Sequence, residues 1–514
     1  MPLVRALALA SCSALVLAVA GRAQALRLDA AGGSMPGVLS MDVYPAVNPV
    51  DVVVVVPSTN RGPTPLSWID PFDPRDLEVG IDLLSAIFLG VTGPDGHWRL
   101  DLPLQLAPSL NDTPLYLQAL TLQVTPTLFD RVGNASVVWF APSGAFRDRF
   151  VGSMGGRAFA TVLPRTDGRW LLAGGGGGGL LSQIATDTTE IYDPFSDTFS
   201  NGPVLNAQRS LHTATELPDG RWLLVGGVGP NNDPQAACEI YDPATNTMTP
   251  TAPMLSPRMG HTATLLGNGK VLVTGGLVAL TVTPTQLSAV RDATDLTELY
   301  DPATGTWAPG PLLRDPRAGH IAIPRPDGKV LLAGGISWDP VIVIGWLPTV
   351  RSSCDLYDPV ANTIAAAPSM ANARSMIDAV PLGNDRWLLA GGISSLTLIN
   401  LGTPTATAEI YDAAANTWTT VGAMATARGN HKAWAIAPDR FLVTGGADGS
   451  ILFPTPLATT EIFSTVTNTF SAGPPMHYAR AGAAAYLSPI GQVHVLGGST
   501  TGGQITNSTE WYFF

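Results

Sequence analysis

The stretch that decides the fold begins with RWLLVGG at residues 221–227, continues with CEIYDP at 238–243 and ends with NTMT at 246–249. A short apolar run ends at two glycines, and a second run carries an acid and a tyrosine before Asp-Pro. Each run has the length and the apolar content of a β-strand, and each is bounded by turn residues. The stretch therefore predicts short strands joined by tight connections.

The same pattern recurs seven times between residue 157 and the end of the sequence. The glycine pairs end at Gly175, Gly227, Gly276, Gly335, Gly392, Gly446 and Gly498. Each unit opens with an arginine: Arg157, Arg209, Arg258, Arg317, Arg374, Arg428 and Arg480. Each second run carries an acid: Glu190, Glu239, Glu298, Asp355, Glu409, Glu461 and Glu510. A period of 49 to 59 residues with four short β-rich segments indicates stacked, repeated β units.

The order of a glycine pair, Glu-x-Tyr-Asp-Pro and Asn-Thr-Trp resembles the kelch motif, and the unit at 391–418 shows this order with Ala413 in place of the proline. The resemblance covers 157–514 and implies a β-propeller with four strands per blade. Asp-Gly pairs such as Asp219-Gly220 stand between the first two strands, where a two-residue hairpin turn requires positive φ. We predict an all-β chain, with a seven-bladed kelch-type β-propeller preceded by a small β-sandwich.

Three regions follow from this pattern. Residues 1–25 are a predicted signal peptide, 26–142 a β-sandwich-like domain and 143–514 the propeller. The last unit ends after its third strand, which leaves an open sheet edge. We expect an N-terminal strand near 146–154 to complete the last blade and close the ring.

The leader predicts export. Arg5 precedes an apolar run, and Ala23-Gln24-Ala25 fits a cleavage site of small residues. A lipoprotein signal at Cys12 is the alternative, although it leaves little apolar sequence before that cysteine. We expect a secreted, periplasmic or cell-surface protein, cleaved near Ala25, with no transmembrane segment in the mature chain.

Composition argues against some partners. The chain has a formal net charge of −12, charged residues make up only 13% of it, and three residues are lysine. Nucleic-acid binding needs basic patches that displace counterions, so we predict no nucleic-acid partner. Cys238 and Cys354 occupy the same position in the second and fourth units, so a disulfide between them is excluded if the propeller is correct.

The seven arginines match the seven acids one to one. On alternating strands both fall on the face that carries the loops between the second and third strands, which we name the 2–3-loop face. The count favours structural pairing within each blade, from Arg157–Glu190 to Arg480–Glu510. The alternative is a cationic ring at the channel mouth that binds an acidic ligand. Its members would be Arg209, Arg258, Arg317, Arg374, Arg428 and Arg480.

Aromatic and histidine positions also recur. Large rings fill the space between blades, so we expect these residues in the core: Tyr192, Tyr241, Tyr300, Tyr357, Tyr411, Trp307 and Trp418. Four histidines stand three residues after the opening arginine: His212, His261, His320 and His431. Each belongs to a different blade, which places them too far apart to share one ion, so we predict no metal site and no cofactor.

Departures from the repeat are better guides to function than the repeat itself, because loops carry binding. The fourth 2–3 loop, ISWDPVIVIGWLPTVRSSC at 336–354, is among the longest. Its Trp338, Asp339 and Trp346 suit a sugar or peptide platform. The alternative is that this loop covers the channel mouth or packs on the N-terminal domain.

Kelch-type propellers include galactose-oxidase-like copper enzymes and sialic-acid mutarotases. The copper enzymes need two histidines, an axial tyrosine and a tyrosine joined to cysteine, whereas Cys238 and Cys354 both lie on repeat strands. We predict no catalytic residues and a non-enzymatic scaffold that binds a protein or polysaccharide through the 2–3-loop face. The alternatives are a carbohydrate-active enzyme, oxidase- or mutarotase-like, with its site at the channel mouth, and a structural envelope or extracellular component.

Overall fold

The computed structural model describes separate strands between Arg27 and Arg149. It also describes residues 155–514 except 166, 178–183, 194–197, 279–292, 342–344, 396–401, 451–453 and 489–491. Regular structure in these residues is β apart from one 3₁₀ turn, η4 (Thr501–Gly503). Among them no helix has the length and apolarity to cross a membrane. The predicted leader, 1–25, lies outside the described residues.

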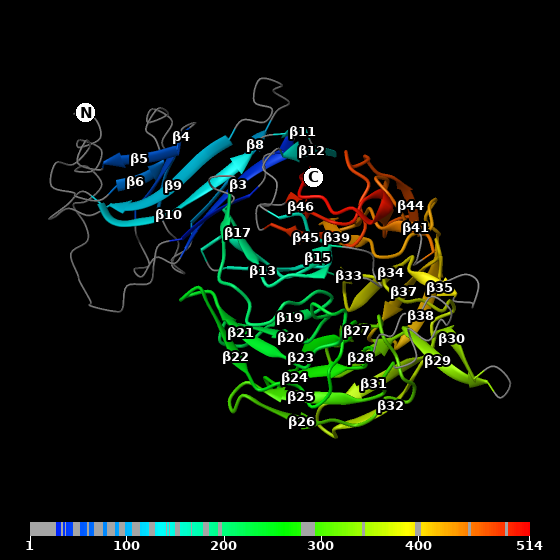
Figure 1. The fold of residues 1–514 in the computed structure, drawn as a ribbon. Helices are drawn as coiled ribbons and strands as arrows, with labels where there is room; N and C mark the ends of the chain where they lie inside the picture. Colours follow the sequence, from blue (N-terminus) through cyan, green and yellow to red (C-terminus); the bar gives the residue numbers. More distant parts are fainter. Residues whose placement is uncertain are drawn as a thin grey trace, which may run out of the picture.

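The N-terminal unit contains two antiparallel sheets (Figure 1). One has the order β1 (Arg27–Ala31), β3 (Gly37–Tyr44), β8 (Trp98–Leu104). The other has the order β10 (Phe129–Trp139), β9 (Pro114–Leu122), β4 (Val52–Ser58), β7 (Phe88–Val91). Two short pairs accompany them: β2 (Ser34–Met35) with β11 (Ala141–Pro142), and β5 (Arg61–Pro65) with β6 (Asp76–Val79). Leu28 and Met41 of the first sheet share one buried cluster with Val53, Val55 and Leu117 of the second. This is a sandwich core, as the sequence predicts.

The rest of the chain forms four-stranded antiparallel sheets, which we number 1 to 7 and list from the first strand outward. Sheet 1 is β13 (Thr161–Pro164), β14 (Trp170–Ala173), β17 (Thr189–Asp193), β18 (Thr198–Asn201). Sheet 2 is β19 (Thr213–Glu216), β20 (Trp222–Val225), β21 (Cys238–Asp242), β22 (Thr247–Thr251). Sheet 3 is β23 (Thr262–Leu265), β24 (Val271–Thr274), β25 (Thr297–Asp301), β26 (Thr306–Pro309). Sheet 4 is β27 (Ile321–Pro324), β28 (Val330–Ala333), β31 (Cys354–Asp358), β32 (Thr363–Ala367).

The remaining three sheets follow the same order. Sheet 5 is β33 (Ala379–Gly383), β34 (Arg386–Ala390), β37 (Ala408–Asp412), β38 (Thr417–Val421). Sheet 6 is β39 (Lys432–Ala437), β40 (Arg440–Thr444), β43 (Thr460–Ser464), β44 (Thr469–Ala472). Sheet 7 is β45 (Ala484–Leu487), β46 (Gln492–Leu496), β47 (Thr509–Phe513) and, at its outer edge, β12 (Ala145–Arg149). Strand β12 thus supplies the fourth strand of the last sheet from the start of the region, pairing Phe146 with Tyr512.

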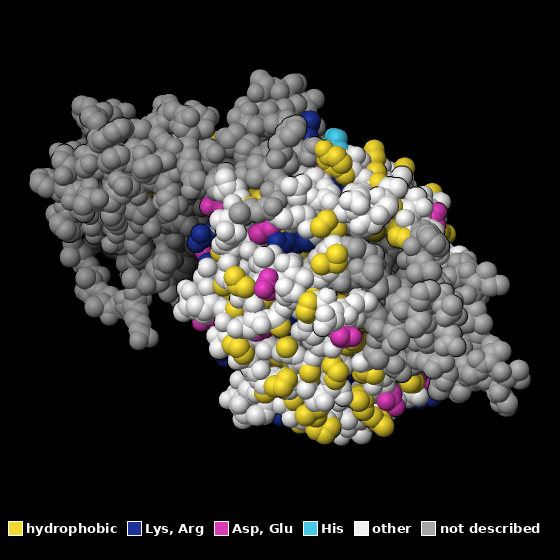
Figure 2. Space-filling model, in the orientation of Figure 1, with side chains coloured by type: hydrophobic (Ala, Val, Ile, Leu, Met, Phe, Trp, Pro, Cys, Tyr) yellow, Lys and Arg dark blue, Asp and Glu magenta, His cyan; other side chains and the backbone are white. Residues whose placement is uncertain are grey.

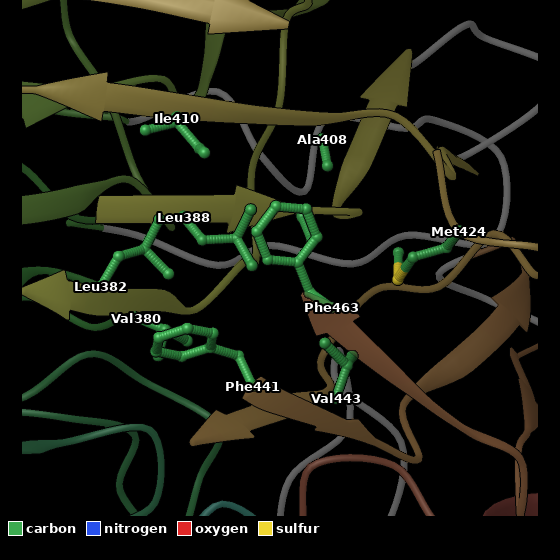
Figure 3. Close-up of a cluster of buried hydrophobic side chains, with 10 residues drawn as sticks. Val380, Leu382, Leu388, Ala408, Ile410, Met424, Phe441, Val443 and Phe463 are labelled. Atoms are coloured by element: carbon green, nitrogen blue, oxygen red, sulfur yellow. The ribbon is translucent and has the colours of Figure 1, made fainter. Parts of the chain in front are cut away.

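Hydrophobic clusters join each sheet to the next. Val380 and Leu388 of sheet 5 pack with Phe441, Val443 and Phe463 of sheet 6 (Figure 3). Similar clusters join sheets 1 and 2, 2 and 3, 3 and 4, 4 and 5, and 6 and 7. A last cluster joins sheet 7 to sheet 1, which closes a ring. The all-β propeller that the sequence predicts is confirmed, and the ring is visible in Figure 1.

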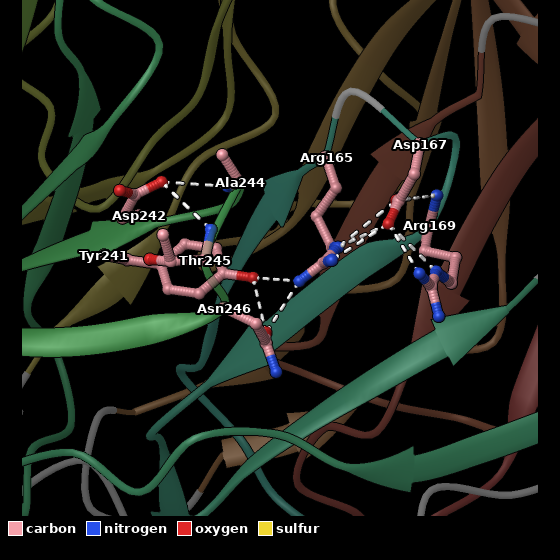
Figure 4. Close-up of polar contacts among 8 residues, drawn as sticks. All are labelled: Arg165, Asp167, Arg169, Tyr241, Asp242, Ala244, Thr245 and Asn246. Atoms are coloured by element: carbon pink, nitrogen blue, oxygen red, sulfur yellow. Dashed lines mark hydrogen bonds and ion pairs between the residues drawn. The ribbon is translucent and has the colours of Figure 1, made fainter.

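The turn between the third and fourth strands explains the Asn-Thr part of the repeat. Asn246 and Asn416 have φ of 55° and 54°, a conformation that asparagine tolerates better than most residues. The hydroxyl of Tyr241 donates to Oδ1 of Asn246 across 3.0 Å, and that of Tyr411 donates to Asn416 across 2.7 Å. Arg165 of sheet 1 also reaches Tyr241 and Asn246, which ties two neighbouring sheets together (Figure 4). The five predicted tyrosines are buried in the core, with Tyr241 and Tyr411 fully buried, whereas Trp307 and Trp418 are partly buried and pack against it.

Candidate functional site around the ring axis

The opening arginines are buried and paired with the acids of their own sheets. The arginine side chains are at most 4% exposed. An Nη2 atom lies 2.7 Å from the carboxylate in Arg209–Glu239 and Arg374–Glu409, and 2.8 Å in Arg480–Glu510. The distances are 3.1 Å for Arg428–Glu461 and 3.2 Å for Arg317–Asp355. Arg157–Glu190 and Arg258–Glu298 form the same bond.

Each arginine also closes the base of a 2–3 loop. Nη1 of Arg374 donates to the carbonyls of Gly391 and Thr407, at 3.0 Å each, which are the first and last residues of that connection. The paired acid, Glu409, accepts hydrogen bonds from the backbone N–H groups of Ala371 and Asn372. All seven arginines bond two such carbonyls. Each opening arginine is therefore paired with an acid of its own sheet, and the alternative that six of them bind an acidic ligand stays a prediction.

The glycine pairs allow this close packing. Gly391 has φ of 65°, and a Cβ on it would lie 2.5 Å from the carbonyl oxygen of Arg428 and 3.1 Å from Cε1 of His431. The first glycine of a pair therefore lets the chain take positive φ and lets the next sheet approach.

The recurrent histidines link neighbouring first strands rather than surrounding an ion. Nε2 of His212 lies 2.8 Å from Oγ1 of Thr161, and Nε2 of His261 lies 3.0 Å from Oγ1 of Thr213. In His320 the same nitrogen bonds Thr262 and Thr274. Burial lowers the pKa of His261 to about 3, so these rings are neutral. Among the described residues no three His, Cys, Asp or Glu side chains gather as metal ligands.

The histidine series departs from its pattern between sheets 5 and 6. Asp378 stands where sheets 1 to 3 have threonine, and its carboxylate contacts Nζ of Lys432 at 3.5 Å. The backbone N–H of Ala433 donates to the same oxygen across 3.3 Å. Among the residues that the structure describes, neither ring nitrogen of His431 has a hydrogen-bond partner, whereas Nε2 of each of the other three histidines does. Burial lowers the pKa of His431 to about 4.

A second departure lies between sheets 6 and 7. Ala483 occupies the position of the recurrent histidine, and beside it is a cavity of about 10 Å³. Lys432, Thr444, Gly445 and Met476 are among the residues that line the cavity. This is the space that an imidazole fills between sheets 3 and 4, where Cε1 of a histidine packs on the first glycine of the pair.

Seven residues, each two positions after an opening arginine, form a ring around the axis on the 2–3-loop face. We name it the axial ring: Phe159, Leu211, Gly260, Gly319, Met376, Asn430 and Gly482. Backbone N–H groups donate to the carbonyl of the preceding member. The bonds measure 2.8 Å from Phe159 to Gly482, 2.9 Å from Met376 to Gly319 and 3.1 Å from Asn430 to Met376. Three further bonds of the same kind join other neighbouring members. Among the described residues, no such bond joins the members of sheets 1 and 2.

Outside the axial ring, the 2–3 loops form short hairpins. They are β15 (Gly176–Gly177) with β16 (Ile184–Ala185), β29 (Ile336–Val341) with β30 (Gly345–Val350), β35 (Ile393–Ser395) with β36 (Thr403–Pro404), and β41 (Ala447–Gly449) with β42 (Pro454–Pro456). Strand β30 contacts β35, β36 contacts β41, and β42 contacts η4 of sheet 7. The loops of sheets 4 to 7 thus lie side by side as a continuous row, which we name the loop row.

Three candidate binding residues lie in the first hairpin of the loop row. Trp338 pairs with Pro348, Asp339 with Leu347, and Trp346 with Pro340 across β29 and β30. Their side chains lie outside the described residues, so their binding role stays a prediction. The long loop is a hairpin whose strand β30 lies beside the next loop of the row.

The two faces of the propeller differ in surface chemistry. Most of the exposed large apolar side chains of the described propeller residues lie on the 2–3-loop face (Ile184, Val204, Leu255, Leu296, Leu312, Tyr478 and Ile505), while Leu265, Val360 and Val466 are exposed on the opposite face. Its exposed charged side chains, among the described residues, are Asp233, Arg314 and Asp448. The opposite face carries ion pairs at its turns, such as Arg221–Asp219, Lys270–Asp301 and Lys329–Asp358. Figure 2 shows many hydrophobic and few basic side chains on the side in view.

The repeat predicts neither the axial ring nor the Asp378–Lys432 pair. The ring positions differ from unit to unit, so no repeat marks them. The charged pair had one available signal, since Asp378 and Lys432 interrupt a series that reads threonine in the first three units.

No protein-family model matches the sequence, and no curated protein matches it. The structure is similar to a fungal alcohol oxidase of the AA5 family, determined in complex with copper. The two share 18% identity with a TM-score of 0.54, over 72% of this chain and 76% of the oxidase. It is also similar to YjhT, with 15% identity and a TM-score of 0.44, over 59% of this chain and 93% of that protein. The oxidase likeness concerns the fold alone and agrees with the kelch, galactose-oxidase-like fold.

The described residues do not fit the copper centre that this fold family implies. Such a centre needs a cysteine joined to a tyrosine, but Cys238 and Cys354 lie on strands β21 and β31 with free thiols. Sγ of Cys238 donates to the carbonyl of Ala236. Burial raises the pKa of both thiols to about 11, which keeps them protonated at neutral pH. These are core cysteines.

Proposed function

We propose that this protein is an exported, non-enzymatic scaffold that binds a protein or polysaccharide through its 2–3-loop face. One observation carries the proposal: the two faces of the ring are chemically different. The opposite face carries ion-paired turns and exposes Leu265, Val360 and Val466, whereas the 2–3-loop face exposes seven large apolar side chains, among them Tyr478 and Ile505, with few charges between them. Apolar surface poor in charge is typical of a binding surface.

The loop row supports the same face. Its exposed described residues include Ser395, Thr403, Thr455 and Gln504, which offer hydroxyl and amide groups. Neutral polar groups beside apolar side chains suit an uncharged partner. Because each arginine near the axis is bonded within its own sheet, the face has little positive charge for an acidic ligand. Export rests on the leader at 1–25, which the sequence alone supports.

Binding can be tested with a panel of neutral polysaccharides and a phage-displayed library of short random peptides, applied to the full mature chain. We expect at least one class to bind. Thr455→Arg, which adds a large charged side chain to the loop row, should weaken that binding. Val466→Arg lies on the opposite face, where Val466 is 75% exposed, and serves as the matched control. Equal loss in both variants, or binding of neither class, contradicts the proposal.

A further inference from the structure

The axial ring contains residues whose backbone is unusual for their type. Eleven non-glycine residues among those described have positive φ, and eight of them are asparagine or aspartate, which tolerate it. The other three are Phe159, Leu211 and Met376, with φ of 55°, 52° and 53°. All three belong to the axial ring. At the equivalent positions of sheets 3, 4 and 7 the chain has glycine, which adopts this conformation without strain.

Core packing does not account for two of these three side chains. Leu211 packs on Val228 and Met259. Phe159 and Met376 are partly exposed and belong to no hydrophobic cluster of the described residues. These two side chains impose a conformational free-energy cost on the backbone and do not offset it by packing in the hydrophobic core. Such strained residues are often found at functional sites.

The axial ring holds these side chains in fixed places. The Phe159 ring lies against Gly482, because a Cβ there would be 2.5 Å from Cε1 of the phenylalanine. Cγ of Met376 lies over Gly319 in the same way, 3.5 Å from where a Cβ would stand. Nδ2 of Asn430 is 3.9 Å from Sδ of Met376. Backbone hydrogen bonds from sheet to sheet join the residues that carry these side chains.

The chemistry of these side chains indicates an apolar anchor group with a nearby hydrogen bond. A phenylalanine ring and a thioether offer adaptable apolar contact. The Asn430 amide can bond a peptide group. The seven nearby guanidinium groups are buried in their own sheets, and the exposed neighbours on this face are mostly apolar, so the surroundings suit an uncharged protein segment.

We infer that Phe159, Met376 and Asn430 form an anchor site on the ring axis, which binds an apolar side chain of an uncharged segment of a protein partner. This inference rests on the proposed binding function of the 2–3-loop face and adds the partner's class and the residues that contact it.

The test uses glycine variants, because glycine keeps the positive φ while removing the side chain. The full mature chain, wild type and Phe159→Gly/Met376→Gly, is immobilised and screened against a phage-displayed library of short random peptides. Peptides enriched on the wild type should share an aromatic or aliphatic residue and should bind the double variant about tenfold more weakly. Thermal unfolding should show that the variant is folded.

Asn468→Gly is the matched control, since Asn468 has φ of 55° in a turn on the opposite face. It should leave peptide binding unchanged. Peptides that bind both variants as tightly as the wild type would overturn the anchor site while leaving the proposed function intact. Binding of a neutral polysaccharide alone would overturn the protein partner, and binding of neither class would overturn both proposals.

Discussion

Replacing Arg374 by methionine tests whether the buried arginines hold the 2–3-loop face together. The side chain is fully buried and bonds Glu409, Gly391 and Thr407. Methionine fills a similar space but leaves the Glu409 carboxylate without its cation and two carbonyls without a donor. Removing one partner of a buried ion pair costs about 3–5 kcal/mol, because the remaining charge is buried and unpaired.

The assay is thermal unfolding followed by circular dichroism. A loss of about 1 kcal/mol lowers the Tm of a domain of 150–250 residues by about 2–4 °C, and it lowers the Tm of a larger domain by less. We therefore expect the Tm of Arg374→Met to be roughly 5–10 °C below that of the wild type. Arg221→Met is the control, because Arg221 and Asp219 are 42% and 48% exposed. Exposed pairs contribute about 0–1 kcal/mol, so this variant should unfold close to the wild type.

A double variant, Arg374→Met with Glu409→Leu, separates the charge from the backbone bonds. It removes the unpaired charge but leaves the carbonyls of Gly391 and Thr407 and the N–H groups of two loop residues without partners. It should recover only part of the lost stability. A single variant as stable as the Arg221→Met control would refute the structural role of the arginines.

Three further predictions concern neighbouring positions. Gly391→Ala should lower the Tm much more than Gly383→Ala, because both have positive φ but only Gly391 has a carbonyl within 2.5 Å of the new Cβ; equal effects would contradict the packing argument. The pKa of His431 is about 4 in the folded protein against 6.5 in the unfolded chain, so the folded state loses about 3 kcal/mol of stability as the pH falls from ~6.5 towards 4. Between pH 7 and pH 5, the free energy of unfolding should therefore fall less in His431→Gln than in the wild type. Ala483→His should fill the cavity beside Thr444 and raise the Tm by the equivalent of about 1 kcal/mol, whereas a lower Tm would show that the space is too small.

Much of the fold follows from the repeat. Each unit carries its own strands, turn residues and apolar positions, so local sequence and overall architecture agree. The one-to-one count of arginines and acids gave the hypothesis of structural pairs because both residues recur at fixed positions within one unit. The closing strand was expected near 146–154, and the structure has β12 at Ala145–Arg149, since pairing with β47 sets its limits.

The site was harder to predict because it depends on how sheets meet. Spacing gives His212 and His261 equivalent positions in their units, but it does not tell that each imidazole bonds a threonine of the preceding sheet. The positive φ of Phe159 and Met376 occurs where the backbone of one sheet bonds that of the neighbouring sheet, which the sequence of one unit does not show. The loop row likewise depends on contacts between units, which a single repeat does not encode.

We propose that the partner binds to the 2–3-loop face. The most direct measurement is hydroxyl-radical footprinting of the mature chain, with and without the peptide or polysaccharide that binds it. The account predicts protection of Tyr478 and Ile505, which are 41% and 38% exposed on that face, while Val360 and Val466 on the opposite face keep their reactivity. Protection of Val360 and Val466 with no change at Tyr478 and Ile505 would contradict it.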